Sequence, residues 1–162
     1  MSEIGDIIQE KCLAFGDRII KLNDFLLEQA ASKMYDGGSK KSVSHHPSQV
    51  PLPSSVSHHP SRVPSHLQSV ATLSNQLLRA GTSIGANNAE ATSAISKADF
   101  KSKSYIALKE ARESLYWIDL LHRNNYIDEN VYQSIYNECE ELIKLLVHRC
   151  KKLEEQLKVG TK

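Results

Sequence analysis

The sequence predicts an all-α protein, an antiparallel up-down-up-down four-helix bundle with a long disordered loop between its first two helices. Four segments carry apolar residues at spacings of three and four, which is the periodicity of an amphipathic helix. No segment shows sustained alternation of apolar and polar residues, so no sheet is expected. Each helix should be about 39 to 46 Å long at 1.5 Å per residue. Amphipathic helices of matched length bury their apolar stripes by packing on one another.

The first helix is predicted over about residues 3–31 and the second over about residues 69–94. The apolar stripe of the first consists of Ile4, Ile8, Cys12, Phe15, Ile19, Leu22 and Leu26. The stripe of the second consists of Val70, Leu73, Leu77, Gly81, Ile84, Asn88 and Ala91. Each helix therefore has one face that needs a partner.

The third helix is predicted to begin at Ser96, a good N-cap, with Asp99 three residues later to bond the first-turn amides. Asn124 and Asn125 mark its end. The fourth helix opens at Asp128, a second capping residue. The third stripe consists of Phe100, Ala107, Leu108, Ala111, Leu115, Ile118 and Leu121, and the fourth of Val131, Ile135, Cys139, Leu142, Leu146, Cys150, Leu153 and Leu157.

The domain organisation follows from these elements. Residues 1–31 are assigned to the first helix, residues 32–68 to a His/Pro/Ser repeat insertion, and residues 69–160 to helices two to four. Within the insertion, Ser42–Ser48 recurs as Ser55–Ser61, and all five prolines of the protein fall there. Such a composition does not form a packed core, so the insertion is predicted to be disordered.

The histidine pairs of this repeat admit two interpretations. His45–His46 and His58–His59, together with His66, could bind a transition metal loosely, since imidazole is a common ligand. A flexible repeat offers no fixed geometry, however, and no thiolate or carboxylate lies close by in the sequence. An expanded loop that the bundle tolerates is therefore the favoured interpretation, and no metal site is predicted.

Two glycines interrupt the second stripe. Gly81 and Gly85 each cost about 1 kcal/mol relative to alanine in a helix interior. A helix that keeps both gains from having no side chain there, which predicts close approach of another helix backbone. Asn88 continues the same stripe and is predicted to be buried, where an unbonded amide costs roughly 1–3 kcal/mol. The predicted helix-packing and polar-clasp residues are Gly81, Gly85, Asn87, Asn88 and Glu90; ligand binding by the amides is the alternative.

Charge gives a weak indication of partners. The net charge is +1, and outside residues 32–70 the basic and acidic residues nearly cancel. A dedicated nucleic-acid-binding domain is usually strongly basic. Only a local basic surface could therefore bind nucleic acid. The predicted nucleic-acid face consists of Lys97, Lys101, Lys109 and Arg112, with aromatic residues interleaved. An ordinary solvated helix face is the alternative.

The sequence contains no recognisable catalytic constellation. Di-metal bundles use paired Glu-x-x-His motifs, whereas this chain has only one related pair, Asp119 and His122. The Gly81–Gly85 stretch lacks the Gly-Lys-Ser/Thr ending of a phosphate loop. We therefore predict no enzyme activity, no catalytic residue and no cofactor.

The three cysteines and the N-terminus indicate a compartment. Cys12, Cys139 and Cys150 lie on apolar stripes and are odd in number, which is typical of buried free thiols in a reducing environment. No run is apolar enough to span a bilayer, and the acidic N-terminus does not resemble a signal peptide. A cytoplasmic protein without membrane contact is expected.

The second and third helices contain motifs of a known family. These motifs are Leu77–Asn87, Ala89–Ala91, Ser96–Phe100, Ile106–Ala111 and Tyr116–Trp117. They resemble the bacterial four-helix-bundle family that includes proteins encoded in intervening sequences of large-subunit ribosomal RNA genes. That family is related to accessory proteins of diversity-generating retroelements. Asn88, where an apolar residue is expected, and the long repeat are departures from its pattern.

The resemblance implies an up-down-up-down bundle without enzyme activity that assembles into homo-oligomeric rings, with pentamers expected. For the retroelement accessory relatives, it also implies binding of nucleic acid and of a reverse transcriptase through a basic ring surface. The leading hypothesis is a self-assembling scaffold that contacts RNA, DNA or a nucleoprotein partner such as a reverse transcriptase. The alternative is a purely structural protein-interaction module without nucleic-acid binding.

Overall fold

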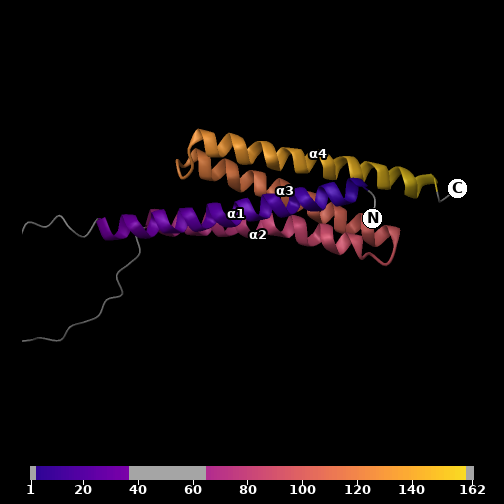
Figure 1. The fold of residues 1–162 in the computed structure, drawn as a ribbon, viewed down its shortest axis with the longest axis horizontal. Coiled ribbons are helices and arrows are strands. Elements are labelled where there is room, and N and C mark those ends of the chain that lie inside the picture. Colours follow the sequence, from indigo (N-terminus) through magenta and orange to yellow (C-terminus); the bar gives the residue numbers. More distant parts are fainter. Residues whose placement is uncertain (1–2, 37–64, 160–162) are drawn as a thin grey trace, which may run out of the picture.

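Four antiparallel helices form the described part of the chain (Figure 1). The computed structural model describes residues 3–36 and 65–159. Its helices are α1 (Glu3–Asp36), α2 (Ser65–Thr92), α3 (Lys97–Arg123) and α4 (Glu129–Val159). These residues contain no strand, and the predicted all-α four-helix fold is confirmed.

The helices around the repeat are longer than the sequence indicated. Residues 32–36 continue α1 and residues 65–68 begin α2, although both stretches were assigned to the insertion. The physical reason lies in the helix-breaking residues: Gly37 and Gly38 follow directly after α1, and Pro64 directly precedes α2. The insertion prediction for residues 37–64, including the histidine pairs, lies outside the described residues.

The predicted caps of α3 and α4 are present. The Ser96 side chain accepts a hydrogen bond of 3.1 Å from the Asp99 amide. The C-cap of α3 is Asn124, and Asn125 then adopts a φ of 58°, a left-handed conformation that asparagine tolerates. The Asp128 carboxylate accepts a hydrogen bond of 2.9 Å from the Val131 amide. Local chemistry therefore sets both ends of the α3–α4 connection.

The core runs the length of the bundle and contains the predicted stripes. Its largest fully buried side chains are Ile8, Phe15, Ile19, Leu26, Leu77, Ile84, Asn88, Ile118, Leu121, Ile135, Leu142 and Leu146. Eleven of these twelve are apolar, and Asn88 is the polar exception. Five predicted stripe residues, Leu73, Phe100, Leu115, Val131 and Leu157, are half-buried.

The bundle is closed unevenly. Neighbours in sequence pack closely, while α1 and α4 make far fewer contacts with each other. Two ion pairs cross this seam: Lys11 with Glu141 at 2.9 Å, and Arg18 with Glu138. The N-terminus and C-terminus lie at the same end of the bundle (Figure 1). The seam is therefore held partly by surface charge and not by apolar packing alone.

Candidate functional site

A basic groove lies between α3 and α4. It encloses about 370 Å³ and is lined by basic, aromatic and apolar residues, with one acidic residue. Its lining includes Tyr105, Lys109, Arg112, Val147, Lys151 and Glu154. The α3 residues lie on one side of that helix because they are spaced three or four apart, and α4 supplies Lys151 from across the groove. We call this the α3–α4 groove.

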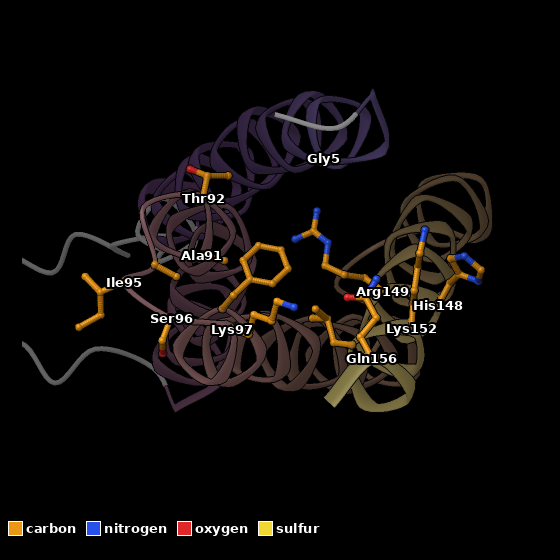
Figure 2. Close-up of a pocket in the computed structure, with 13 residues that line it drawn as sticks. Gly5, Ala91, Thr92, Ile95, Ser96, Lys97, His148, Arg149, Lys152 and Gln156 are labelled. Atoms are coloured by element: carbon orange, nitrogen blue, oxygen red, sulfur yellow. The ribbon is translucent and has the colours of Figure 1, made fainter. Parts of the chain in front are cut away.

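The predicted nucleic-acid face divides between different surfaces. Lys109 and Arg112 line the α3–α4 groove. Lys101 lies at the next hollow along and pairs with Glu154 at 3.6 Å. Lys97 belongs elsewhere, because it lines a pocket at the end of the bundle (Figure 2). The structure therefore does not bring the four residues into one site.

A tyrosine and a glutamate are coupled at the rim of the α3–α4 groove. The Tyr105 hydroxyl donates a 2.6 Å hydrogen bond to Glu154 Oε1. This bond, with some loss of hydration, raises the pKa of Tyr105 to about 12. It also lowers the pKa of Glu154, with Lys101 adding to the effect. The one carboxylate of the groove is thus bound by Tyr105 and Lys101 of α3. Lys109, Arg112 and Lys151 therefore make the groove positively charged.

Sequence reasoning missed the basic residues of α4. Lys151 lies in the α3–α4 groove, and His148, Arg149 and Lys152 line the same pocket at the end of the bundle as Lys97. A signal was present, since these residues form a basic cluster next to Cys150 on the fourth stripe. Their significance depends on which helix lies opposite, and helical periodicity does not specify that.

The polar residues after the glycines behave in two ways. Asn88 is fully buried; its amide donates to Gln9 of α1, and its carbonyl oxygen accepts from Arg149 of α4. This is the interhelical clasp that the sequence predicted, extended to three helices. Asn87 instead donates to the Ser83 carbonyl of its own helix at 2.8 Å.

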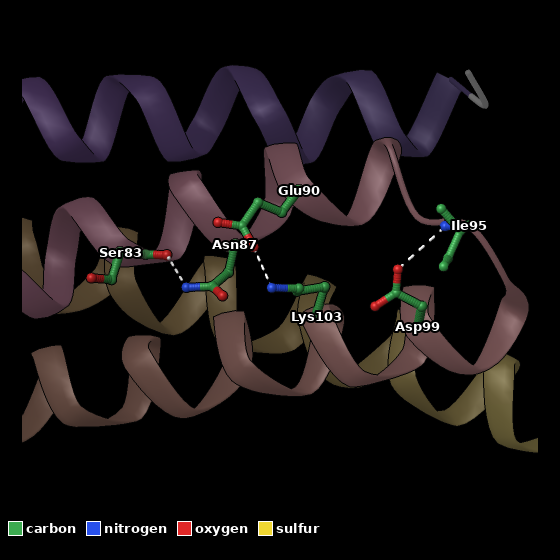
Figure 3. Close-up of polar contacts among 6 residues, drawn as sticks. All are labelled: Ser83, Asn87, Glu90, Ile95, Asp99 and Lys103. Atoms are coloured by element: carbon green, nitrogen blue, oxygen red, sulfur yellow. Dashed lines mark hydrogen bonds and ion pairs between the residues drawn. The ribbon is translucent and has the colours of Figure 1, made fainter.

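Glu90 contributes a second interhelical contact, on the outer side of the bundle. Figure 3 shows it paired with Lys103 of α3, beside the intrahelical bond of Asn87. Beyond it, the Ile95 amide donates to Asp99 Oδ2 at 3.2 Å, which closes the α2–α3 turn. Glu90 therefore helps to hold α2 against α3, while Asn87 does not join helices.

The two stripe glycines face α1. A Cβ added at Gly81 would lie 3.1 Å from Cγ1 of Ile19, closer than most real contacts. A Cβ added at Gly85 would lie 3.5 Å from Cβ of Cys12 and 3.9 Å from its backbone oxygen, which is ordinary van der Waals distance. The helices do approach closely at both positions, but only Gly81 excludes a side chain tightly.

The three thiols are free and buried. Burial raises the pKa of Cys12 to about 11 and that of Cys139 to about 12, and it also raises the pKa of Cys150. The nucleophilic form of cysteine is the thiolate. These side chains are therefore protonated at neutral pH and act as core residues.

His122, the histidine of the single Asp119/His122 pair, lies in the last turn of α3. Its Nε2 is 2.9 Å from Glu129 Oε2, and its ring stacks on Tyr132 at 4.0 Å between centroids. The Tyr132 hydroxyl donates to Asp119 at 3.0 Å.

Among the described residues no group of three or more His, Cys, Asp or Glu side chains has an arrangement that could hold a metal ion. None of the helices in residues 3–36 and 65–159 is apolar over a length that would cross a membrane.

Comparisons with known proteins identify similar chains. Residues 61–148 match the profile of the 23S rRNA-intervening sequence protein family. The chain is also similar to a crystal structure from Bacteroides thetaiotaomicron, described as a protein with unknown function from the S23 ribosomal protein family. The two are 34% identical, the match covers 91% of this chain and 98% of that one, and the TM-score is 0.66. No curated protein sequence matches significantly.

Proposed function

Since the chain belongs to the 23S rRNA-intervening sequence protein family, we propose that it is a non-enzymatic, self-assembling scaffold that contacts RNA or DNA. The observation that carries this proposal is the α3–α4 groove, where Lys109, Arg112 and Lys151 converge beside Tyr105. The protein would act alone on nucleic acid or as an accessory to a nucleoprotein partner such as a reverse transcriptase.

The groove has the chemistry that a single strand needs. Backbone phosphates are held by lysine and arginine, and unstacked bases are held by aromatic faces. Tyr105 is partly exposed, at 38%, and Lys109, Arg112 and Lys151 are exposed on the two sides. Because the overall charge is only +1, binding would depend on this local cluster. A short contact of a few phosphates is expected.

Self-assembly is supported by apolar side chains left on the surface of α1. Ile7, Leu13, Ile20 and Phe25 are each more than two-fifths exposed. Leu13 and Ile20 lie about two turns apart on one side of α1, and grouped exposed apolar side chains are typical of interaction sites. We propose that this surface joins copies of the chain in a closed ring, a pentamer in the form that the family resemblance implies.

The nucleic-acid proposal is tested by fluorescence anisotropy with a labelled single-stranded RNA over a range of salt concentrations. Affinity should fall as salt rises, and removing three phosphate contacts should lower the log–log salt slope by about 2. The test variant carries Lys109→Gln, Arg112→Gln and Lys151→Gln. The matched control carries Lys21→Gln, Arg123→Gln and Lys144→Gln, which removes the same charge from other surfaces. Equal affinity of both variants for RNA would refute the groove as the contact surface.

A purely structural interaction module is the second candidate, favoured by the exposed apolar residues of α1. It predicts assembly without salt-dependent RNA binding. Sedimentation at micromolar concentration tests the self-assembly that both candidate functions require. A monomer under these conditions would contradict both.

A further inference from the structure

A second hollow lies at the end of the bundle where α1 begins and α4 ends. It encloses about 690 Å³, within the size range of small-molecule sites. Its walls come from the end of α2, the α2–α3 turn, the start of α3 and the last third of α4, with Gly5 of α1 at one edge. Figure 2 looks into this hollow, which we call the end pocket. It is separate from the α3–α4 groove and shares no lining residue with it.

The charge of the end pocket is of one sign. Lys97, His148, Arg149 and Lys152 line it, and its described lining contains no aspartate or glutamate. Figure 2 shows the side chains of Lys97 and Arg149, from α3 and α4, directed into the same space. Positive charges gathered around a hollow raise the local concentration of anions.

Arg149 is the buried member of this set. It is only 8% exposed, and its Nη1 donates to Asn88 Oδ1. A guanidinium has five N–H donors and matches planar or tetrahedral oxyanions in a two-pronged contact. Among the described residues no carboxylate lies within ion-pair distance of it. Burial lowers the pKa of Arg149, as expected for a cation without a counter-charge.

The remaining wall is apolar. The Phe100 ring lies 5.7 Å from the Arg149 guanidinium carbon, and Ala91, Ala94 and Leu153 complete the surface around it. An inorganic ion would leave most of the volume empty. The pocket therefore suits a ligand with an anionic end and an apolar or aromatic body.

We propose that the end pocket binds a small organic phosphate monoester, with the phosphate on Arg149, Lys97 and Lys152 and the organic body against Phe100. A monoester carries close to two negative charges at neutral pH, which fits several cations better than a carboxylate does. The pocket's ligand chemistry is shared by free nucleotides and by the 5′-phosphate end of a nucleic acid. The proposal does not rest on the α3–α4 groove.

Calorimetric titration of the full chain with matched probes tests the site. AMP is a monoester, 3′,5′-cyclic AMP is the corresponding diester with one charge, and adenosine has the same body without phosphate. AMP should bind at least about tenfold more tightly than either, because only it places a doubly charged phosphate on the cations. Inorganic phosphate should bind more weakly than AMP because it lacks the body. Equal affinity for AMP and adenosine, or no heat with any probe at millimolar concentration, would overturn the proposal.

Variants assign the binding to the pocket. Lys152→Gln and Lys97→Gln change exposed residues and should weaken AMP binding severalfold without affecting folding. Arg149→Lys keeps the charge but loses the two-pronged contact, so about a tenfold loss is expected. Lys151→Gln is the matched control, since Lys151 is the sequence neighbour of Lys152 but lines the α3–α4 groove and not the end pocket. It should leave AMP affinity unchanged, and an equal loss with Lys151→Gln and Lys152→Gln would show that only general charge matters.

Two oligoribonucleotides of one sequence, with and without a 5′-phosphate, distinguish the ligand sources. Both are titrated into the variant that lacks Lys109, Arg112 and Lys151, so that failure of the proposed groove does not obscure the end pocket. Tighter binding of the phosphorylated strand than of AMP assigns the site to a nucleic-acid end. Tighter binding of AMP assigns it to a free nucleotide.

Discussion

Single residues on the stripes of this bundle have distinct roles that their sequence pattern does not separate. Gly81 and Gly85 look equivalent, spaced one turn apart on the same face of α2. The space available to a side chain differs, however, because Gly81 meets the branched Ile19 side chain and Gly85 meets the smaller Cys12. At Gly81 the Ile19 side chain occupies the space that a Cβ would need, whereas at Gly85 there is room for a methyl group.

Substituting the two glycines should give opposite results. Gly85→Ala should raise the free energy of unfolding by about 0.5–1 kcal/mol, because alanine costs less entropy in a helix and its methyl meets no clash. Gly81→Leu should lower it by about 1–3 kcal/mol through overpacking against Ile19. Urea denaturation followed by circular dichroism measures both. A Gly81→Leu variant as stable as wild type would show that α2 and α1 are not tightly packed there.

Cys139 should make stability fall with alkaline pH. Burial raises its pKa from 9 to about 12 in the folded protein. The unfolded chain releases this proton first, so the contribution is complete below pH 9 and is lost as pH rises towards 12. At pH 10 the loss relative to pH 7 should be on the order of 1 kcal/mol. The measurement is the difference in unfolding free energy between these pH values for wild type and Cys139→Ala; identical differences would disprove the assignment.

At the scale of elements, one buried polar chain ties three helices together. Gln9 of α1, Asn88 of α2 and Arg149 of α4 are joined through the two ends of the Asn88 amide. The amphipathic pattern of each helix does not depend on these three polar side chains. The clasp fixes the register of α4 against α2 across a bundle whose α1–α4 seam is sparsely packed.

Breaking this clasp at its centre should be costly. Asn88→Leu leaves the Arg149 guanidinium buried without its acceptor, so the free energy of unfolding should fall by about 2–4 kcal/mol. Replacing Arg149 by Met in the same chain removes the orphaned charge and should recover at least half of that loss. A double-mutant cycle in urea measures the coupling. Additive effects of the two substitutions would mean that the residues do not interact.

At the scale of the whole molecule, the bundle is built from two well-packed hairpins whose outer edges meet weakly. The α1–α2 pair joins α3–α4 through the α2–α3 interface, and two surface ion pairs help to close the α1–α4 seam. The repeat lies between the helices of the first hairpin, so its length affects the closure of that hairpin and not the pairing of the others.

Shortening the repeat tests its structural role. Replacing residues 37–64 with a six-residue Gly/Ser linker should raise the free energy of unfolding by about 1 kcal/mol, because a shorter loop loses less entropy on closure. The helix content, measured by circular dichroism, should be unchanged. The oligomeric state, measured by sedimentation velocity, should be unchanged as well. A large loss of stability would show that these residues pack on the bundle and are not a tolerated insertion.

The sequence by itself determined the local features of this protein. Helical periodicity located four helices, Ser96 and Asp128 marked two helix starts, and the stripe position of Asn88 predicted its burial. These features depend on residues within a few turns of one another, where spacing and side-chain chemistry decide the outcome. The helix ends near the repeat were less accurate, because residues 32–36 and 65–68 have no strong helix-breaking character of their own.

Only the tertiary structure decided which surfaces those helices share. Lys97, Lys101, Lys109 and Arg112 form one helical side in the sequence, yet the packing of α4 places Lys109 and Arg112 in one groove and Lys97 in another pocket. Arg149 gains its role from Asn88, 61 residues away in the chain. Helical spacing specifies the direction of a side chain on its own helix, whereas a binding site depends on the helix that lies opposite.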